Sequence, residues 1–230
     1  MIDLSRDGDV YVLAMDNGEN RFSPAMLDAL EAALATVEAH EGPNGLVTTG
    51  SGKFFSNGLD VDHMSADPDG LLEYLNRVDR LFASVLSLPC PTAAALNGHA
   101  FGAGAMLALA HDQRLMRTER GYWCLPEVDL GMPFPAGMRT LVMARLPRVT
   151  AHEAMVSGRR FDAEDALGAS IVDAVRPVEE LLAETVTRVQ ARAHQSGSNL
   201  AGIRTGIHAD VMAALRRGEW SPASDEVEGR

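Results

Sequence analysis

The sequence predicts an α/β fold that continues into a C-terminal helical region, and two observations carry this prediction. Short β-rich runs alternate with amphipathic helical stretches through most of the 230 residues, as expected for strands packed against helices. The last two helical stretches, 178–195 and 199–216, have no strand between them. We therefore expect a strand-and-helix core over residues 1–176, a helical region over 177–217 and a disordered polar tail over 218–230.

The individual elements follow from local patterns along the chain. Ser23 supplies an N-cap and Pro24 a proline at the first helical position, so a helix is predicted over 24–40. A second long helix, 71–88, has apolar residues at helical spacing, and Asp162 with Asp165 resembles a capping box for a short one over 163–169. The other predicted elements are strands at 10–15, 46–49, 92–96, 113–116, 122–125 and 171–175, and helices at 102–110, 137–145 and 150–156.

Charge and cysteine content exclude several classes of partner. The formal net charge of −12 argues against nucleic acid or an anionic membrane surface as a main partner. Cys90 and Cys124 lie far apart and have no metal-ligand partner at a usual spacing, so neither a disulfide framework nor a metal site is expected. No apolar run has the length of a membrane span. Because no secretory signal is visible and the last three residues are not a peroxisomal address, we expect a cytoplasmic protein.

A glycine-rich turn after the predicted strand 92–96 is the most informative stretch. Gly102, Ala103 and Gly104 lie where this strand turns into an alanine- and leucine-rich helix. The first N–H groups of a helix have no partner inside it, and the helix dipole favours negative charge there. This turn is suited to an anion or to a carbonyl oxygen that gains negative charge. The pattern lacks the third spaced glycine of a dinucleotide-binding turn and lies about a hundred residues into the chain.

Two further segments are informative. One leads from a strand toward a helix in the same way, and the other carries a candidate acid. Residues 54–60 (Phe-Phe-Ser-Asn-Gly-Leu-Asp) again lead from a strand end through small residues toward a helix. Residues 126–131 (Pro-Glu-Val-Asp-Leu-Gly) contain Glu127, a glutamate that has no neighbouring basic residue in the sequence. On sequence alone, the pattern around Glu127 favours a solvated loop residue over an acid–base group.

Along the chain, the segments 55–60, 97–104 and 126–131 follow one another at a spacing that resembles the crotonase superfamily, also called the enoyl-CoA hydratase/isomerase family. The likeness extends from about Val10 to Val175 and is strongest to the delta-3, delta-2-enoyl-CoA isomerase branch. It implies a spiral of ββα units with a C-terminal helical trimerisation region, and a homotrimer or a hexamer made of two trimers. It also implies an acyl-CoA thioester as substrate, a role in fatty acid metabolism and no cofactor, since coenzyme A belongs to the substrate.

The resemblance assigns a role to backbone N–H groups. In this family two amides form an oxyanion hole that stabilises negative charge on the thioester oxygen. Carried over by motif, the donors are the amides of Leu59 and Ala103. The family usually has glycine where Ala103 stands; alanine keeps the N–H and is compatible if its φ is negative. The resemblance further predicts a substrate-binding set of Ser56, Gly58, Asp60, Gly102 and Phe134.

The number of carboxylates decides the expected reaction. Hydratases of the superfamily have a two-glutamate arrangement. The first of these two positions holds Met106 in this sequence, which leaves Glu127 alone. A single glutamate can carry one proton between C2 and C4 of an enoyl chain, so an isomerase is predicted. This reaction needs Glu127 in an apolar cleft, and the predicted surroundings are apolar: Trp123, Leu125, Val128, Met132 and Phe134. Two alternatives remain: a hydratase that uses another acid, Asp129 first, and a catalytically silent acyl-CoA-binding protein. The residues that contact the phosphates of coenzyme A are left open, with Lys53, Arg159 and Arg160 as candidates.

Overall fold

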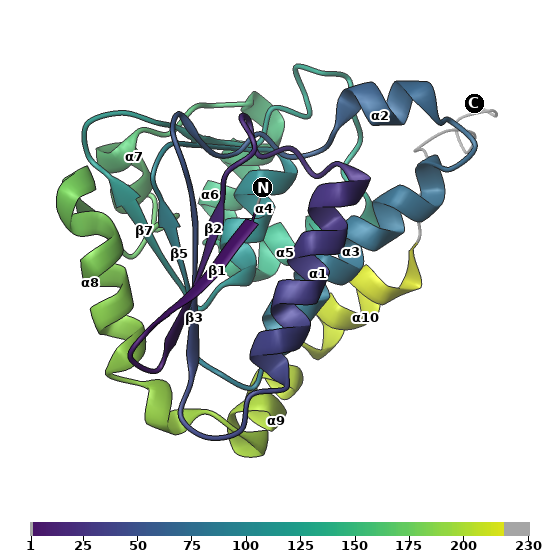
Figure 1. Cartoon of the computed structure of the whole chain (residues 1–230). Coiled ribbons are helices and arrows are strands. Elements are labelled where there is room, and N and C mark those ends of the chain that lie inside the picture. Colours follow the sequence, from purple (N-terminus) through teal and green to yellow (C-terminus); the bar gives the residue numbers. More distant parts are fainter. Residues whose placement is uncertain (1, 219–230) are drawn as a thin grey trace, which may run out of the picture.

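Two β-sheets organise the chain, of which a computed structural model describes residues 2–218 (Figure 1). Within that range the main sheet has, in spatial order, strands β1 (Ile2–Asp7), β2 (Val10–Met15), β3 (Gly45–Gly50), β5 (Thr92–Leu96), β7 (Gln113–Arg117) and β9 (Ala174–Arg176). β1 pairs antiparallel with β2, and all other neighbours are parallel. A smaller parallel sheet contains β4 (Phe54–Ser56), β6 (His99–Phe101) and β8 (Trp123–Cys124).

Helices cover both faces of the main sheet. One face packs against α1 (Pro24–Glu38), α3 (Leu71–Ser87), α4 (Ala103–Ala110) and α5 (Ala136–Arg145), and the other against α8 (Val178–Gln190), as Figure 1 shows. The remaining helices are α2 (Val61–Ala66), α6 (Arg148–Ser157), α7 (Ala163–Gly168), a 3-10 turn (Ala193–Gln195), α9 (Ser198–Ile207) and α10 (Ala209–Arg217). Within the described residues, no helix is both long and apolar enough to cross a membrane.

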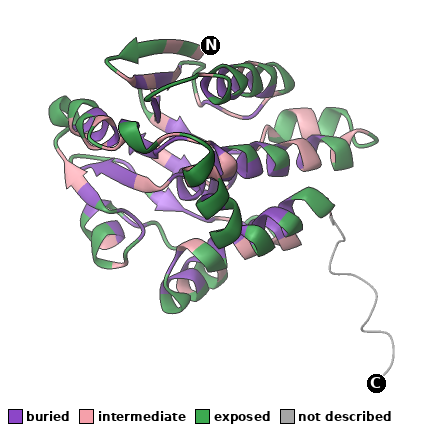
Figure 2. Cartoon of the chain, turned by 90° about the horizontal axis from the view of Figure 1, so that it is seen from below, coloured by how far each residue is buried: buried purple, intermediate pink, exposed green. Residues whose placement is uncertain are grey.

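The inner strands of the main sheet are buried on both faces, which explains their apolar runs. Val12 and Val47 point toward Leu181 of α8, whereas the adjacent Leu13 and Leu46 point into the core beneath α1 and α3. This alternation follows from the two-residue period of a strand. Figure 2 shows the same division, with buried residues along the strands and on the inner sides of the helices.

The two loops after β4 and β6 come very close together because glycine stands at the contact. A Cβ on Gly104 would lie 2.4 Å from the carbonyl oxygen of Ser56, and one on Gly58 would lie 2.9 Å from the amide nitrogen of Ala103. Neither distance is possible for a real side chain, so these residues must lack one. Gly58 also has a φ of +80°, a conformation that favours glycine.

The structure corrects several element predictions. β1 was not predicted, because it is a mostly exposed edge strand with a polar sequence, and the short β6 directly follows a turn. The predicted strand 171–175 begins only at Ala174, since the Ile171 amide instead donates to the Ala166 carbonyl at 2.8 Å and closes the end of α7. The sequence also predicts that residues 67–70 (Asp-Pro-Asp-Gly) cap α3; the N-cap is Gly70, and no side chain caps the helix.

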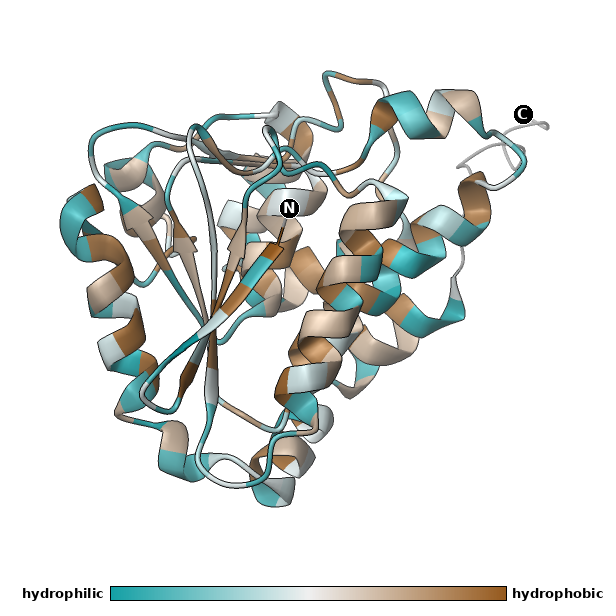
Figure 3. Cartoon of the chain, viewed as in Figure 1, coloured by the Kyte–Doolittle hydropathy of each residue, from teal (hydrophilic) through white to brown (hydrophobic). Residues whose placement is uncertain are grey.

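The C-terminal helices are shorter than the sequence predicts. The expected helix 178–195 ends at Gln190 and is followed by the separate 3-10 turn. The expected helix 199–216 is two helices that meet at His208, which has non-helical backbone angles. Apolar and polar residues mix along these helices in Figure 3. The division of the chain at residues 176 and 177 stays a prediction, and residues 219–230 of the expected disordered tail lie outside the described residues.

Candidate active site

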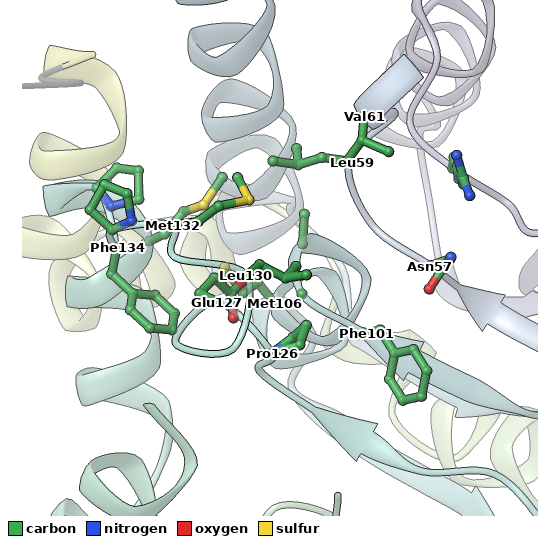
Figure 4. Close-up of a pocket in the computed structure, with 16 residues that line it drawn as sticks. Asn57, Leu59, Val61, Phe101, Met106, Pro126, Glu127, Leu130, Met132 and Phe134 are labelled. Atoms are coloured by element: carbon green, nitrogen blue, oxygen red, sulfur yellow. The ribbon is translucent and has the colours of Figure 1, made fainter. Parts of the chain in front are cut away.

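A cavity of about 320 Å³ lies where the loops after β4, β6 and β8 meet the segment that leads into α5. Five of the residues singled out from the sequence line it: Leu59, Gly102, Ala103, Glu127 and Phe134. Figure 4 shows Glu127 near the middle of the cavity. The small sheet brings these residues together from segments far apart in the sequence, because its three strands are parallel and end at the same edge.

Three other predicted site residues lie behind the cavity wall. Ser56, Gly58 and Asp60 are not among the lining residues within the described part of the chain. The Ser56 hydroxyl is fully buried and hydrogen-bonded to backbone groups. The Asp60 carboxylate caps α2 by accepting from the His63 amide at 3.2 Å, and its own amide donates to the Tyr74 hydroxyl at 2.8 Å. These contacts support the wall of the site; direct binding of substrate by the three residues stays a prediction.

Two backbone amides at the cavity have no protein partner. Within residues 2–218, neither the Leu59 N–H nor the Ala103 N–H donates a hydrogen bond, although both residues line the cavity. Ala103 is the first residue of α4 and has a negative φ, so alanine is accommodated there without strain. The dipole of α4 adds positive potential at this end. The two amides can therefore donate to an oxygen of a bound molecule.

Glu127 is a buried carboxylate in an apolar environment. Only 8% of the residue is exposed, and its Oε2 atom is buried without a hydrogen-bond partner in the described part of the chain. Burial raises the pKa of Glu127 from 4.5 to about 7, and a hydrogen bond from its own backbone N–H acts in the opposite direction. Met106, which is 1% exposed, lies beside it together with Leu130 (Figure 4). A carboxyl group in this state can both accept and release a proton near neutral pH.

Comparison with known proteins identifies the family. The family model described as enoyl-CoA hydratase/isomerase matches residues 6–219. The chain belongs to this family. It is 32% identical to enoyl-CoA delta isomerase 3 of Arabidopsis thaliana over 92% of this chain and 93% of the relative. It is 34% identical to the peroxisomal enoyl-CoA delta isomerase 2 of the same plant, over 94% and 95%.

A solved structure agrees with both the fold and the branch. An apo enoyl-CoA isomerase of Mycobacterium tuberculosis superimposes with a TM-score of 0.86 and 28% identity, covering 94% of this chain and 95% of that one. The predicted crotonase-like fold and the isomerase branch of the enoyl-CoA hydratase/isomerase family are thus confirmed.

The position of Asp129 bears on how a member of this family could use a second acid. Residues 126–132 form consecutive turns rather than a strand, with the Asp129 amide donating to the Pro126 carbonyl at 3.0 Å. Asp129 is therefore not held on the same face as Glu127. Its carboxylate is exposed and lies next to Gly158, where an added Cβ would be 2.5 Å from Oδ2. Among the described residues that line the cavity, Glu127 is the one carboxylate.

The apolar surroundings expected for Glu127 are only partly the ones predicted. Met132 and Phe134 line the cavity, as predicted. Trp123 and Leu125 are fully buried in the core behind it, and Val128 is about half exposed. The buried pair acts through burial of the loop rather than by contact with the cavity.

The candidate phosphate contacts differ in their environment. Arg159 pairs with Glu153 at 2.7 Å and with Asp165 at 2.8 Å, so its charge is already compensated. Arg160 lies over the ring of Phe101, 5.8 Å from its centroid.

Arg21, which was not predicted from the sequence, is the one cationic side chain among the described residues that line the cavity. Arg21 immediately precedes a phenylalanine and a helix cap, and nothing in that local pattern marks it as part of a site.

Proposed function

We propose that this protein, an enoyl-CoA isomerase of the family, moves a double bond of an acyl-CoA thioester from C3 to C2 with Glu127 as its single proton carrier. The observation that carries the proposal is the combination of one buried carboxylate with two unpaired amides around one apolar cavity. The carboxylate supplies the acid–base group, and the amides supply donors for the charge that forms on the substrate.

The proposed reaction uses these groups in turn. The Glu127 carboxylate takes a proton from C2 of a 3-enoyl thioester, and the electron pair spreads over the conjugated chain onto the thioester oxygen. The N–H groups of Leu59 and Ala103 stabilise that charge; losing one such donor typically raises a barrier by about 2.7–4 kcal/mol. Glu127 then returns its proton to C4, which leaves the double bond at C2 and restores the carboxylate.

The pKa of Glu127 suits both halves of this cycle. A group with a pKa near 7 is a stronger base than an ordinary carboxylate and still holds its proton long enough to deliver it. Hydration would in addition require a group to orient and activate water. The apolar Met106 beside Glu127 and the exposed position of Asp129 support isomerisation over hydration.

The test uses trans-3-hexenoyl-CoA and follows products by mass and chromatography. We expect trans-2-hexenoyl-CoA at unchanged mass from the wild-type protein. The Glu127→Gln variant should lose turnover and still bind the thioester in calorimetry. Turnover retained by this variant would refute the proton-carrier role. Addition of water to trans-2-hexenoyl-CoA would instead support a hydratase, and tight binding without conversion of either thioester would support a silent binding protein.

Assembly and cellular location are further proposals. We propose a homotrimer or a hexamer of two trimers formed through the C-terminal helical region. Exposed apolar side chains on α9, Ile203 (52% exposed) and Ile207 (71%), support an interface on this helix. Light scattering coupled to size-exclusion chromatography tests it. We keep the cytoplasm as the proposed compartment and propose no cofactor beyond the coenzyme A of the substrate.

A further inference from the structure

The loop that carries the Leu59 amide is held by the segment that precedes α1. The Asn57 amide donates to the Glu19 carbonyl at 2.9 Å, and the Phe22 amide donates to the Gly58 carbonyl at 2.8 Å. Residues 19–22 thus run alongside the loop, although about 35 residues separate the two in sequence. Polar side chains add to these backbone contacts: Asn57 Nδ2 donates to the Glu19 carboxylate at 3.0 Å, and Asn20 and Ser56 bond to the backbone of the facing segment.

Asn20 is the centre of this connection. It is fully buried, and its φ of 52° is a left-handed conformation that asparagine tolerates better than most residues. Its Nδ2 donates to the carbonyls of Phe54 at 3.2 Å and Phe55 at 3.1 Å. Its own carbonyl accepts from the Ser56 hydroxyl at 2.7 Å. A single residue therefore fixes three successive residues of β4.

Ser56 extends the connection to the glycine before the oxyanion donor. Its hydroxyl donates to the Asn20 carbonyl and accepts from the Gly58 amide at 3.1 Å. Gly58 is thereby held at both ends, by Ser56 at its N–H and by Phe22 at its C=O. This matters because Gly58, with its φ of +80° and no side chain, has no conformational restraint of its own.

The two hydrogen bonds that hold Gly58 determine the direction of the following backbone N–H, that of Leu59. The peptide bond between Gly58 and Leu59 is trans, so its N–H and C=O point in opposite directions. Since the carbonyl is directed at the Phe22 amide, the Leu59 N–H is directed away from Phe22, and Leu59 lines the cavity. If the peptide rotated, the carbonyl oxygen would replace the N–H at the cavity and repel a negative charge.

We infer that Ser56 and Asn20 are positioning residues for the oxyanion hole, a conclusion that rests on the proposed isomerase function. Neither residue lines the cavity. They act by keeping the Gly58–Leu59 peptide in the one orientation that presents a donor. In this inference Ser56, predicted from the family resemblance to bind substrate, acts on the site through the backbone.

The variants follow from this arrangement. Ser56→Ala leaves the Gly58 N–H buried without its partner and frees the peptide to rotate. We expect kcat to fall by up to about a hundredfold, the lower end of the loss caused by deleting one oxyanion donor, with KM nearly unchanged. Ser56→Cys keeps a weak donor and acceptor and should recover part of kcat. Asn20→Gly keeps the left-handed backbone without strain and removes only the side-chain bonds, so it should also lower kcat.

The readout that separates positioning from mere stability is binding of acetoacetyl-CoA, whose enolate carries charge on the thioester oxygen and has its own ultraviolet absorption. Wild-type protein should hold this ligand largely as the enolate, and Ser56→Ala should shift it toward the neutral form at saturating ligand. Ser196→Ala is the matched control. The Ser196 hydroxyl likewise donates to a carbonyl (Gly42, 2.9 Å) and accepts from an amide (Asn44, 3.3 Å), but far from the cavity.

The possible outcomes distinguish a failure of the proposed isomerase function from a failure of the positioning inference. If wild-type protein neither isomerises trans-3-hexenoyl-CoA nor binds the enolate, the proposed function is wrong. If wild-type protein does both and Ser56→Ala keeps full kcat and the full enolate signal, the positioning inference alone is wrong. An equal loss in Ser56→Ala and Ser196→Ala also overturns it. Should Ser56→Ala fail to fold, the Cys and Asn20→Gly variants decide by the same two measurements.

Discussion

Burial of Glu127 should make the protein less stable as the pH rises, and Glu127→Gln should remove this effect. In the folded chain burial holds the pKa of this carboxyl at about 7, whereas its ordinary value, expected in the unfolded chain, is 4.5. Between these two values the folded state binds the proton and the unfolded state does not. The stability contributed by this group is therefore fully present below pH 4.5 and is lost as the pH rises to about 7.

The magnitude follows from the difference between the two pKa values. Each pKa unit corresponds to about 1.4 kcal/mol, so the wild-type protein loses about 3 kcal/mol of unfolding free energy from this residue between pH 4.5 and pH 7. Above pH 7 the loss is constant. Glutamine has nearly the same shape and does not titrate. Any change in unfolding free energy that the substitution itself causes is therefore the same at every pH.

Urea unfolding at pH 4.5, 6 and 8 measures this directly. We expect the difference in unfolding free energy between Glu127→Gln and wild type to grow by about 3 kcal/mol in favour of the variant from the lowest pH to the highest. Glu38→Gln, at the exposed end of α1, is the control and should parallel wild type. Parallel curves for Glu127→Gln and wild type would refute the claim that the carboxylate is desolvated, and with it the main reason for its suitability as a base.

Three further substitutions test the site. Ala103→Pro removes one N–H at the first position of α4, where proline is tolerated, so helicity should persist while kcat falls by about 10²–10³; unchanged kcat would exclude this amide as a donor. Gly104→Ala should cost about 1–3 kcal/mol in urea unfolding, because its Cβ would collide with the Ser56 carbonyl; wild-type stability would mean that the loops can move apart. Asp129→Asn should keep trans-3-hexenoyl-CoA turnover within about twofold, since its carboxylate lies outside the cavity; a tenfold loss would restore it as a second acid.

The sequence predicts the parts of the fold that are buried and periodic. β2, α1 and α3 lie within two residues of their predicted bounds, because their apolar residues repeat at the period of the element. β1 has no such repeat, since it is an exposed edge strand that is stabilised by pairing with β2. The break in the helix at His208 could not be predicted from the sequence either, because the apolar residues on both sides keep helical spacing.

The site divides in a similar way. Leu59, Ala103 and Glu127 could be assigned from motifs, and the structure brings all three to one cavity. The roles of Asn20 and Ser56 could not be read from the chain, because they depend on backbone partners more than thirty residues away. The burial that raises the pKa of Glu127 likewise comes from tertiary packing.

The use of main-chain donors at Leu59 and Ala103 has a consequence for how this protein can diverge. A side chain at either residue can change while the N–H stays, as the alanine at Ala103 illustrates. Substitution is instead restricted at the neighbouring glycines, Gly58 and Gly104, where an added Cβ would force the loops apart. Among descendants of this chain that keep the activity, we expect substitutions to accumulate at the donors themselves, and to be purged at Gly58 and Gly104.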